Sequence, residues 1–450
     1  MRRAPVLTPL LALACLAVLL AGCKLPTQRG RWNVLVVLVD TQRADRLGAY
    51  GYDRPTSPSL DALAAGAHLF EQARAQASCT FPSVNSLLTS RYPSRFLGQP
   101  GRALGIPEGI PSLGEMLGPR GWDTAAVSAS PVVRNTPSRH NPTAGYGRGF
   151  GRFDEECEWR GGGCVTNRAL ETLDRLREPF FLYLHYLDPH GPYSPPRDIR
   201  ARFVRHRSPL RWIRRGNPNP IFDMIYKRGP RVEVGDDDLG LLRDLYDGEV
   251  ATFDSELARL LDGLRERDVL DRTVVALVSD HGESFLEHGH MKHCRSLYDT
   301  ELKTPLLLRL PRQRDGARHA TAVQNLDLVP TLLDLLGEEE AGGGALEGRS
   351  LVPLLEGRPI EPALSFGAIG ALRSVNDDRH KLIHNLRRGT WELYDVVADP
   401  GESRNLARED RATFARLRTA LLDWVARVEG REGLERSQEA DRRLEALGYL

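Results

Sequence analysis

Three stretches of the chain are almost wholly apolar, and each of them ends at an aspartate. They are Trp32–Val39 before Asp40, Pro179–Leu187 before Asp188, and Thr273–Ser279 before Asp280. Such runs, without polar alternation, are typical of strands buried on both faces of a parallel sheet. Weaker patterns of the same kind predict two more strands, at Trp122–Ser128 and Thr304–Leu310.

Helical patterns lie between these strands. Within Asp244–Arg267, apolar residues recur at helical spacing and form one stripe. Because strands alternate with helices, we expect a doubly wound, mostly parallel α/β sheet over residues 31–365. The Arg-, Pro- and Gly-rich stretch Arg205–Asp238 is interpreted as an irregular insertion over one face.

The pattern changes after about residue 365. Short antiparallel strands followed by a helix are expected at Leu372–Asn376, Lys381–Asn385, Trp391–Val396 and then Arg411–Val428. We therefore expect a smaller C-terminal α+β subdomain over residues 366–450, packed on the main sheet.

Composition supports a folded protein and narrows its partners. The 450 residues are 41% hydrophobic and 27% charged, which is enough for a sizeable core and excludes wholesale disorder. Lys and Arg number 61 against 60 Asp and Glu, so the formal net charge is +1. This balance argues against binding nucleic acid through bulk charge, and no nucleic-acid partner is expected.

The N-terminus has the features of an export signal. Two arginines precede an apolar run from Pro5 to Leu20, and small residues follow it. The run has about 16 residues, fewer than the roughly 20 that span a bilayer. Its ending, Leu20-Ala-Gly-Cys23, resembles the bacterial lipobox, which implies a signal peptide over 1–22 and a lipid on Cys23. An uncleaved anchor helix is the alternative.

Residues 23–30 then form a polar tether. The expected location is outside the cytoplasm, with the lipid anchor as the one link to the membrane. Lys24, rather than Asp, follows Cys23 and favours the outer membrane, at its periplasmic face or at the cell surface.

Four cysteines remain after the expected cleavage site and Cys23. An even number in an oxidising compartment favours disulfides. Cys157 and Cys164 flank Glu-Trp-Arg-Gly-Gly-Gly, a flexible stretch that a disulfide can close into a small loop. Zinc binding by the four is less favoured, since no Cys-x-x-Cys pair exists.

Two carboxylates stand where chemistry gathers in such sheets, beyond the carboxyl ends of the strands. Asp40 and Asp280 follow separate buried strands, and His281 and Gly282 come directly after Asp280. A hard divalent ion accepts two carboxylates, and an imidazole also suits manganese or zinc. The alternative is that each aspartate is only a helix cap.

A hydroxyl group is the second candidate for chemistry. In Ser78-Cys-Thr-Phe-Pro-Ser83, Pro82 suits the first turn of a helix, so Thr80 would stand just before a helix N-terminus. Free N–H groups there stabilise an anion, and a hydroxyl beside a metal can be deprotonated and attack phosphorus or sulfur. The alternative is that Thr80 is merely the N-cap.

Motifs spread along the chain resemble, in the same order, those of the sulfatase family in the alkaline phosphatase superfamily. They are Asn33–Asp40, Arg43–Gly48, Ser57–Asp61, Thr80–Pro93, His185–Pro192, Val278–Glu283, Ser296–Asp299, Gln324–Gly337, Glu392–Asp395 and Asp399–Glu402. The resemblance covers nearly the whole chain after Cys23. It implies a sulfatase-like catalytic domain over 31–365, with the C-terminal subdomain behind it.

The resemblance also implies roles for individual residues. Asp40, Asp280, His281 and Thr80 fall on the ligand positions of one divalent ion, which is calcium, manganese or zinc, and Thr80 is the nucleophile as well.

Three further positions face the substrate in this comparison. His190 falls near the ester oxygen, and His293 falls on a basic position that contacts the transferred group or the leaving oxygen. Lys292 is a neighbouring candidate for binding the substrate. For His293, a solvated loop histidine is the alternative.

The chain departs from the family pattern at several positions. Sulfatases proper convert a Cys or Ser to formylglycine, but Thr80 occupies that position and Cys79 is out of register. Val84 replaces the arginine of the signature, Thr41 replaces a second acid, and Ser128–Pro131 replaces a Lys-x-His segment. No formylglycine is therefore expected.

The motifs that still match resemble those of the threonine branch of the superfamily. The expected activity is hydrolysis of sulfuric or, by preference, phosphoric esters of a small molecule, glycan or lipid. A phospho-group transferase acting on envelope glycans or lipids is one alternative, and a catalytically dead binding protein is another.

Cys79 and Cys294 adjoin Thr80 and His293, so a formed site would bring them close enough for a disulfide.

Overall fold

The structure is a computed structural model that describes residues 29–96, 105–226 and 229–430. The expected signal peptide, Cys23 and most of the tether lie outside these residues. Within the described part, no helix is long and apolar enough to cross a membrane.

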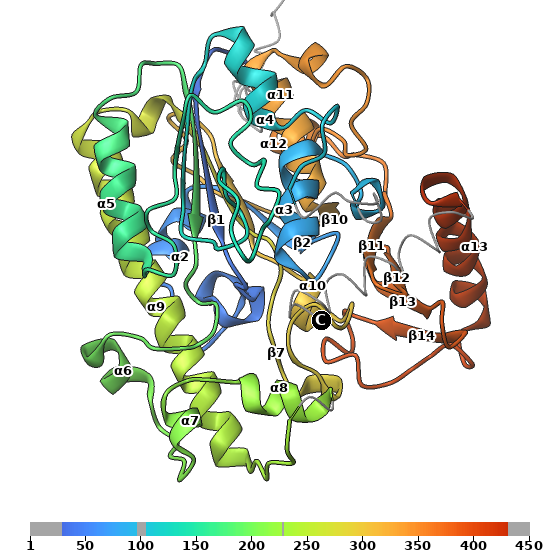
Figure 1. The fold of residues 1–450 in the computed structure, drawn as a ribbon. Helices are drawn as coiled ribbons and strands as arrows, with labels where there is room; N and C mark the ends of the chain where they lie inside the picture. Colours follow the sequence, from blue (N-terminus) through green and yellow to red (C-terminus); the bar gives the residue numbers. More distant parts are fainter. Residues whose placement is uncertain (1–28, 97–104, 227–228, 431–450) are drawn as a thin grey trace, which may run out of the picture.

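An eight-stranded sheet forms the centre of the molecule (Figure 1), in the order β10-β2-β9-β6-β1-β5-β3-β4. The strands are β1 (Asn33–Val39), β2 (His68–Arg74), β3 (Asp123–Ser128), β4 (Arg152–Asp154), β5 (Phe180–Tyr186), β6 (Thr273–Ser279), β9 (Leu306–Arg309) and β10 (Ala317–Gln324). Only β9 runs against its neighbours, β2 and β6. The expected mostly parallel α/β sheet is thus confirmed.

Alternate residues of the central strand serve two separate cores. Leu35, Val37 and Val39 pack against helices on one face, whereas Val34 and Val36 pack on the other. Both sets are fully buried, which explains why β1 has no polar position after Asn33.

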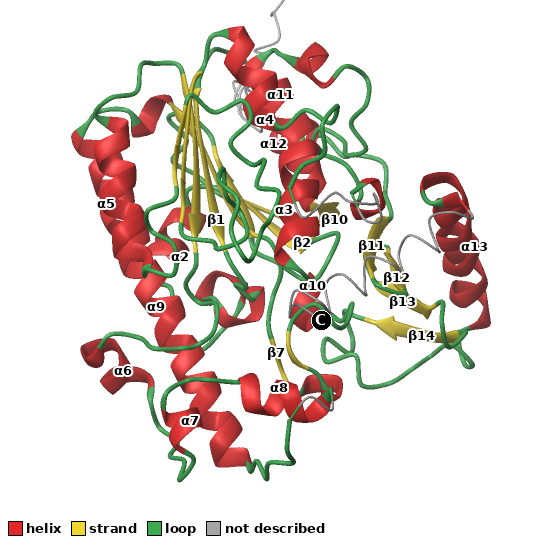
Figure 2. Ribbon diagram, viewed as in Figure 1, coloured by secondary structure: helices red, strands yellow, loops and turns green. Residues whose placement is uncertain are grey.

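Helices cover both faces of the sheet (Figure 2). One face carries α2 (Pro58–Ala65), α5 (Gly162–Leu173) and α9 (Asp236–Glu266). The other carries α3 (Thr80–Thr89), α4 (Leu113–Leu117), α11 (Leu328–Leu336) and α12 (Val352–Leu355). Short elements outside these layers are α6 (Arg197–Phe203), α7 (Arg211–Arg214), α8 (Asn219–Ile225), α10 (Asp299–Leu302) and the pair β7 (Ser284–Phe285) and β8 (Met291–Lys292).

A second, antiparallel sheet forms the C-terminal part. Its strands β11 (Ser365–Ile369), β12 (Leu372–Asn376), β13 (His380–Asn385) and β14 (Thr390–Asp395) lie in sequence order, and α13 (Arg411–Val428) packs beside them (Figure 1). Trp424 of α13 stacks on Phe366 of β11, and Leu417 and Leu393 are fully buried in the same core. The smaller α+β subdomain is therefore present.

The insertion is more regular than the sequence suggested. Within Arg205–Asp238 the chain forms α7 and α8, and α9 already begins at Asp236, eight residues before the apolar stripe. Three consecutive acids open α9, where they favour the positive end of the helix dipole. The expectation of an irregular segment therefore fails at α7, α8 and the start of α9, and it holds for the described loop residues between them.

Candidate active site

Separate strands deliver the candidate metal ligands to one edge of the sheet. Asp40 follows β1 and Asp280 follows β6, and these two strands pair in parallel. Ligand atoms of Asp40, Asp280 and His281 all lie within 4.8 Å of one another, and all three residues are buried. The structure thus brings together the three residues that the sequence assigned to a metal.

The hydrogen bonds of this group leave oxygen atoms for a cation. Oδ1 of Asp280 accepts the backbone N–H groups of Thr41 and His281, at 3.2 and 2.9 Å. The second oxygen of Asp280 and Oδ1 of Asp40 are buried without a hydrogen-bond partner among the described residues. Two such orphaned carboxylate oxygens fit the donor set of a divalent ion.

The electrostatics of the group point the same way. Burial, together with the nearby charge of Asp280, raises the pKa of Asp40 well above its usual range. Two adjacent buried carboxylates repel each other unless a cation lies between them. The site therefore fits a divalent ion, and calcium, manganese and zinc all accept this mixture of ligands.

A hydrogen bond fixes which nitrogen of His281 is available. Nδ1 donates to the carbonyl oxygen of Gly282 at 2.9 Å, so the lone pair lies on Nε2. That nitrogen is 3.2 Å from Oγ1 of Thr80 and 3.4 Å from Oδ2 of Asp280. Thr80 is thus within reach of the same cation as the two carboxylates.

Thr80 is the first residue of α3, and Cys79 is its N-cap. The structure joins Cys79 to Cys294 by a disulfide, and the backbone N–H of Cys294 donates to the carbonyl of Ser78 at 2.7 Å. The loop before Thr80 is therefore attached to the loop that carries His293. The sulfur atom of Cys79 is also occupied, so it is not free for conversion to formylglycine.

A cavity of about 200 Å³ opens onto Thr80 and Asp40. His190, Lys292 and His293 line it too, as the sequence analysis placed them near the substrate. Nζ of Lys292 donates to Asn219 at 3.0 Å. The cavity thus brings the Thr80 hydroxyl together with the side chains of His190, Lys292 and His293 around one space.

Burial lowers the pKa of two of the cavity histidines, His190 and His293, well below the usual value, and the neighbouring basic groups lower it further. Their rings lie 5.2 Å apart, and the His293 ring lies 4.6 Å from that of His281.

Two supporting residues were not singled out from the sequence. Glu283 is fully buried and accepts hydrogen bonds from Nδ1 of His293 at 2.9 Å and from the hydroxyl of Tyr193 at 3.0 Å. His185, in β5, donates from Nε2 to Asp40 at 3.2 Å, and burial lowers its pKa to about 4. Both fix the orientation of a candidate site residue. Each belongs to a motif quoted above, but its partner is far away in the sequence.

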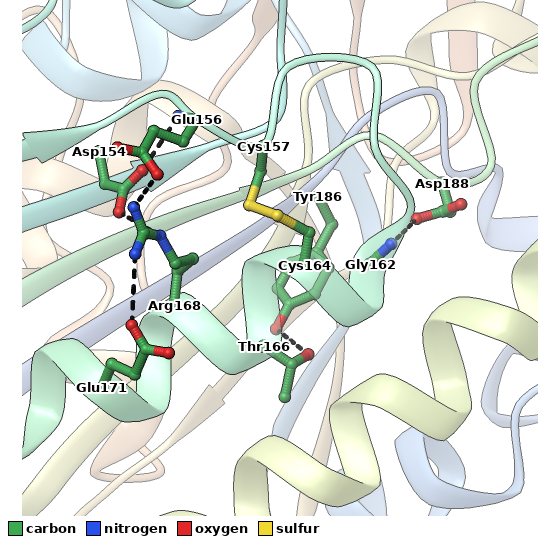
Figure 3. Close-up of a disulfide and its surroundings, with 10 residues drawn as sticks. All are labelled: Asp154, Glu156, Cys157, Gly162, Cys164, Thr166, Arg168, Glu171, Tyr186 and Asp188. Atoms are coloured by element: carbon green, nitrogen blue, oxygen red, sulfur yellow. Dashed lines mark hydrogen bonds and ion pairs between the residues drawn. A yellow bond between two sulfur atoms is a disulfide. The ribbon is translucent and has the colours of Figure 1, made fainter.

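A disulfide-closed loop forms another wall of the cavity. Cys157 bonds to Cys164, at the start of α5, and the N–H of Gly162 donates to Asp188 at 2.6 Å (Figure 3). Asp188 shares a hydrogen bond with the carboxyl of Glu249 in α9, and burial raises the pKa of both groups. The loop is therefore attached to the end of β5, two residues before His190.

Comparison with known proteins identifies the family. The family model described as Sulfatase matches residues 32–338, and one described as N-sulphoglucosamine sulphohydrolase, C-terminal, matches residues 286–427. The chain belongs to the sulfatase family, and it is an ester hydrolase of the alkaline phosphatase superfamily. The resemblance found in its motifs is thereby confirmed.

Individual relatives are distant but similar over most of their length. An uncharacterized sulfatase, YidJ, of Escherichia coli is 25% identical over 444 residues, covering 88% of each chain. Human N-sulphoglucosamine sulphohydrolase is 26% identical, over 88% of this chain and 89% of its own. The phosphonate monoester hydrolase of Silicibacter pomeroyi has the same fold, with a TM-score of 0.70 and 22% identity over 89% of this chain and 96% of its own.

Proposed function

We propose that this hydrolase cleaves phosphoric rather than sulfuric esters, with Thr80 as its nucleophile. The observation that carries the proposal is the position of Thr80: its hydroxyl opens α3, lines the cavity and lies 3.2 Å from Nε2 of His281. The adjacent Cys79 is held in a disulfide, so its thiol is not free for conversion to formylglycine.

The reaction proceeds through the side chains of this cavity. Oγ1 of Thr80 gives its proton to His190 or His293 and attacks phosphorus in line, and the bond to the leaving oxygen breaks. The histidine then returns that proton to the leaving alcohol. Asp40, Asp280, His281 and Thr80 would hold a divalent ion, which would lower the pKa of the hydroxyl and neutralise charge on the transferred group. Water then displaces Thr80 from phosphorus, which regenerates the hydroxyl and releases phosphate.

The chemistry of threonine favours phosphorus over sulfur. A formylglycine hydrate has a second hydroxyl through which it can expel sulfate, whereas Thr80 has a single oxygen. The second step must therefore be a displacement at the transferred atom itself. Val84, at the position of the signature arginine, is fully buried in the apolar core and offers no cation to a sulfate group.

We place the protein outside the cytoplasm, attached through a lipid on Cys23. The lipobox-like sequence supports export. The two disulfides support an oxidising compartment; one joins residues 215 positions apart and the other joins residues seven positions apart. Labelling with a radioactive fatty acid tests this placement, and a protein that loses the label in Cys23→Ala supports it. The substrate is then an anionic ester on a glycan, lipid or small molecule that reaches this compartment.

The function is tested with residues 24–450 produced in an oxidising compartment. Aryl phosphate, aryl phosphodiester and aryl sulfate are assayed side by side, with calcium, manganese or zinc supplied. Thr80→Ala removes the nucleophile, and Thr89→Ala is the matched control at the far end of the same helix. Phosphoester cleavage that Thr80→Ala abolishes and Thr89→Ala retains supports the proposal.

Other outcomes favour the alternatives. Cleavage of the sulfate ester in preference to both phosphoesters contradicts the proposed choice of substrate. Transfer of the phosphoryl group to an added alcohol, faster than to water, indicates the transferase. No cleavage with any metal, and no difference in Thr80→Ala, indicates a binding protein.

A further inference from the structure

Trp159 combines an exposed side chain with an unusual backbone conformation. It is 46% exposed, one of two large apolar side chains in the described part of the chain that are exposed to this degree. Its backbone has φ +58°, in the left-handed region that non-glycine residues rarely adopt. Residues held in such sparsely populated backbone conformations cluster at active sites and ligand clamps.

The protein fixes this residue from several sides. Trp159 lies between Cys157 and Cys164, whose disulfide closes the loop. Its backbone N–H donates to the carbonyl of Ala129, the first residue after β3, at 3.2 Å. Asp188, just after β5, holds the other end of the loop through Gly162 (Figure 3). An exposed indole is thus anchored to the ends of two strands of the catalytic sheet.

Trp159 also lines the same cavity as Thr80. Its ring lies 6.1 Å from that of His190, which in turn lies 5.2 Å from the ring of His293. The indole is therefore next to the histidine proposed to serve the leaving alcohol. This position is where the alcohol part of an ester would lie.

We infer that Trp159 is a stacking platform for a sugar ring in the leaving alcohol of the ester. The inference rests on the proposed function, because it assigns the alcohol part of the same substrate. A hexose has a flat C–H face that packs on an indole, and hydroxyls around its edge. Ser130, His140 and Lys292 line the cavity and can bind those hydroxyls.

Charge near the indole distinguishes a sugar from a cationic alcohol. The ring of His140 lies 5.9 Å from Trp159, and Arg139 donates from Nε to that histidine at 2.8 Å. A quaternary ammonium group also binds to aromatic faces, but here it would meet the guanidinium. A cavity of about 200 Å³ takes the anionic group and one small ring rather than a long lipid chain.

The test measures binding without turnover. In a Thr80→Ala background with manganese supplied, glucose 6-phosphate and phosphocholine are titrated by calorimetry. They share a phosphate, but only the first has a ring. Trp159→Ala removes the platform, Trp159→Phe keeps an aromatic face, and Val397→Ala is the control at the other exposed apolar residue, 55% exposed.

The inference predicts a selective loss. Trp159→Ala should weaken binding of glucose 6-phosphate about tenfold, Trp159→Phe should recover most of it, and phosphocholine should change by less than about twofold. An unchanged dissociation constant for glucose 6-phosphate, no binding of it to the parent, an equal loss for both ligands, or a loss for phosphocholine alone would each overturn the inference.

Hydrolysis by the Thr80-containing protein separates this inference from the proposed function. If Thr80-dependent phosphoester cleavage is absent while the Trp159-dependent binding is present, the platform stands and the proposed function fails. If cleavage is present and binding of the sugar does not depend on Trp159, the proposed function stands and the platform fails.

Discussion

The disulfide between Cys79 and Cys294 should matter more than the one between Cys157 and Cys164. The first joins residues 215 positions apart and the second residues seven apart. If a cross-link stabilises by restricting the unfolded chain, these separations correspond to about 5 and about 2 kcal/mol. Residues 24–450 unfold with an entropy near 0.9 kcal/mol/K, so the expected falls in Tm are about 6 and about 3 °C.

The perturbation is the paired replacement Cys79→Ala with Cys294→Ala, compared with Cys157→Ala and Cys164→Ala. Alanine is preferred to serine because Cys79, Cys157 and Cys294 are almost fully buried, and a buried hydroxyl without a partner would add its own cost. Thermal unfolding followed by circular dichroism gives the two shifts under one set of conditions.

The same variants report on catalysis. Cys79 precedes Thr80 and Cys294 follows His293, so losing that disulfide should loosen the nucleophile relative to a cavity base. We expect kcat at 25 °C to fall at least about tenfold, since displacements of about 1 Å cost up to about 100-fold. An equal or smaller Tm shift than in the Cys157 and Cys164 variant, together with unchanged kcat, would refute the reasoning.

Three further predictions concern buried carboxyl groups. Glu283→Gln should lower kcat about 10- to 100-fold with little change in KM, because the amide has one acceptor oxygen for two donors, Nδ1 of His293 and the hydroxyl of Tyr193; a change in KM alone would contradict this. Dialysis against a chelator should abolish phosphoester cleavage, which a divalent ion should restore in the parent and not in Asp280→Asn; full activity after dialysis would exclude the metal site. Glu249 has a raised pKa in the folded protein, caused by burial and by Asp188, so the folded state retains a proton that the unfolded state loses. Stability should therefore fall as pH rises above about 4.5 toward the raised folded-state pKa, and urea unfolding of Glu249→Gln should show a weaker pH dependence; identical profiles would count against a protonated Glu249.

Strand burial decides how much of the sheet the sequence reveals. The strands β1, β5 and β6 match the apolar runs to within one residue, because burial on both faces leaves few polar positions. By contrast, β10 reads ARHATAVQ and is half exposed at the edge of the sheet, and β2 reads HLFEQAR. Their place in the sheet depends on pairing with each other, which no local pattern records.

The candidate site divides in the same way. Asp40 and Asp280 could be related from the sequence because parallel strands end at one edge. His185 could not, since its contact with Asp40 follows from the register that sets Leu38 opposite His185. Glu283 likewise joins His293 and Tyr193 from two different loops, and its role exists only once those loops meet.

The most direct test of the account is to trap the covalent intermediate. The parent protein and Thr80→Ala are mixed with an excess of aryl phosphate, quenched in acid within milliseconds and mapped by peptide mass spectrometry. We predict a mass increase of one phosphoryl group on Thr80 in the parent, and no modified residue in the variant. A phosphoryl group on another side chain, or cleavage of the ester with Thr80 unmodified at every time point, would contradict the account.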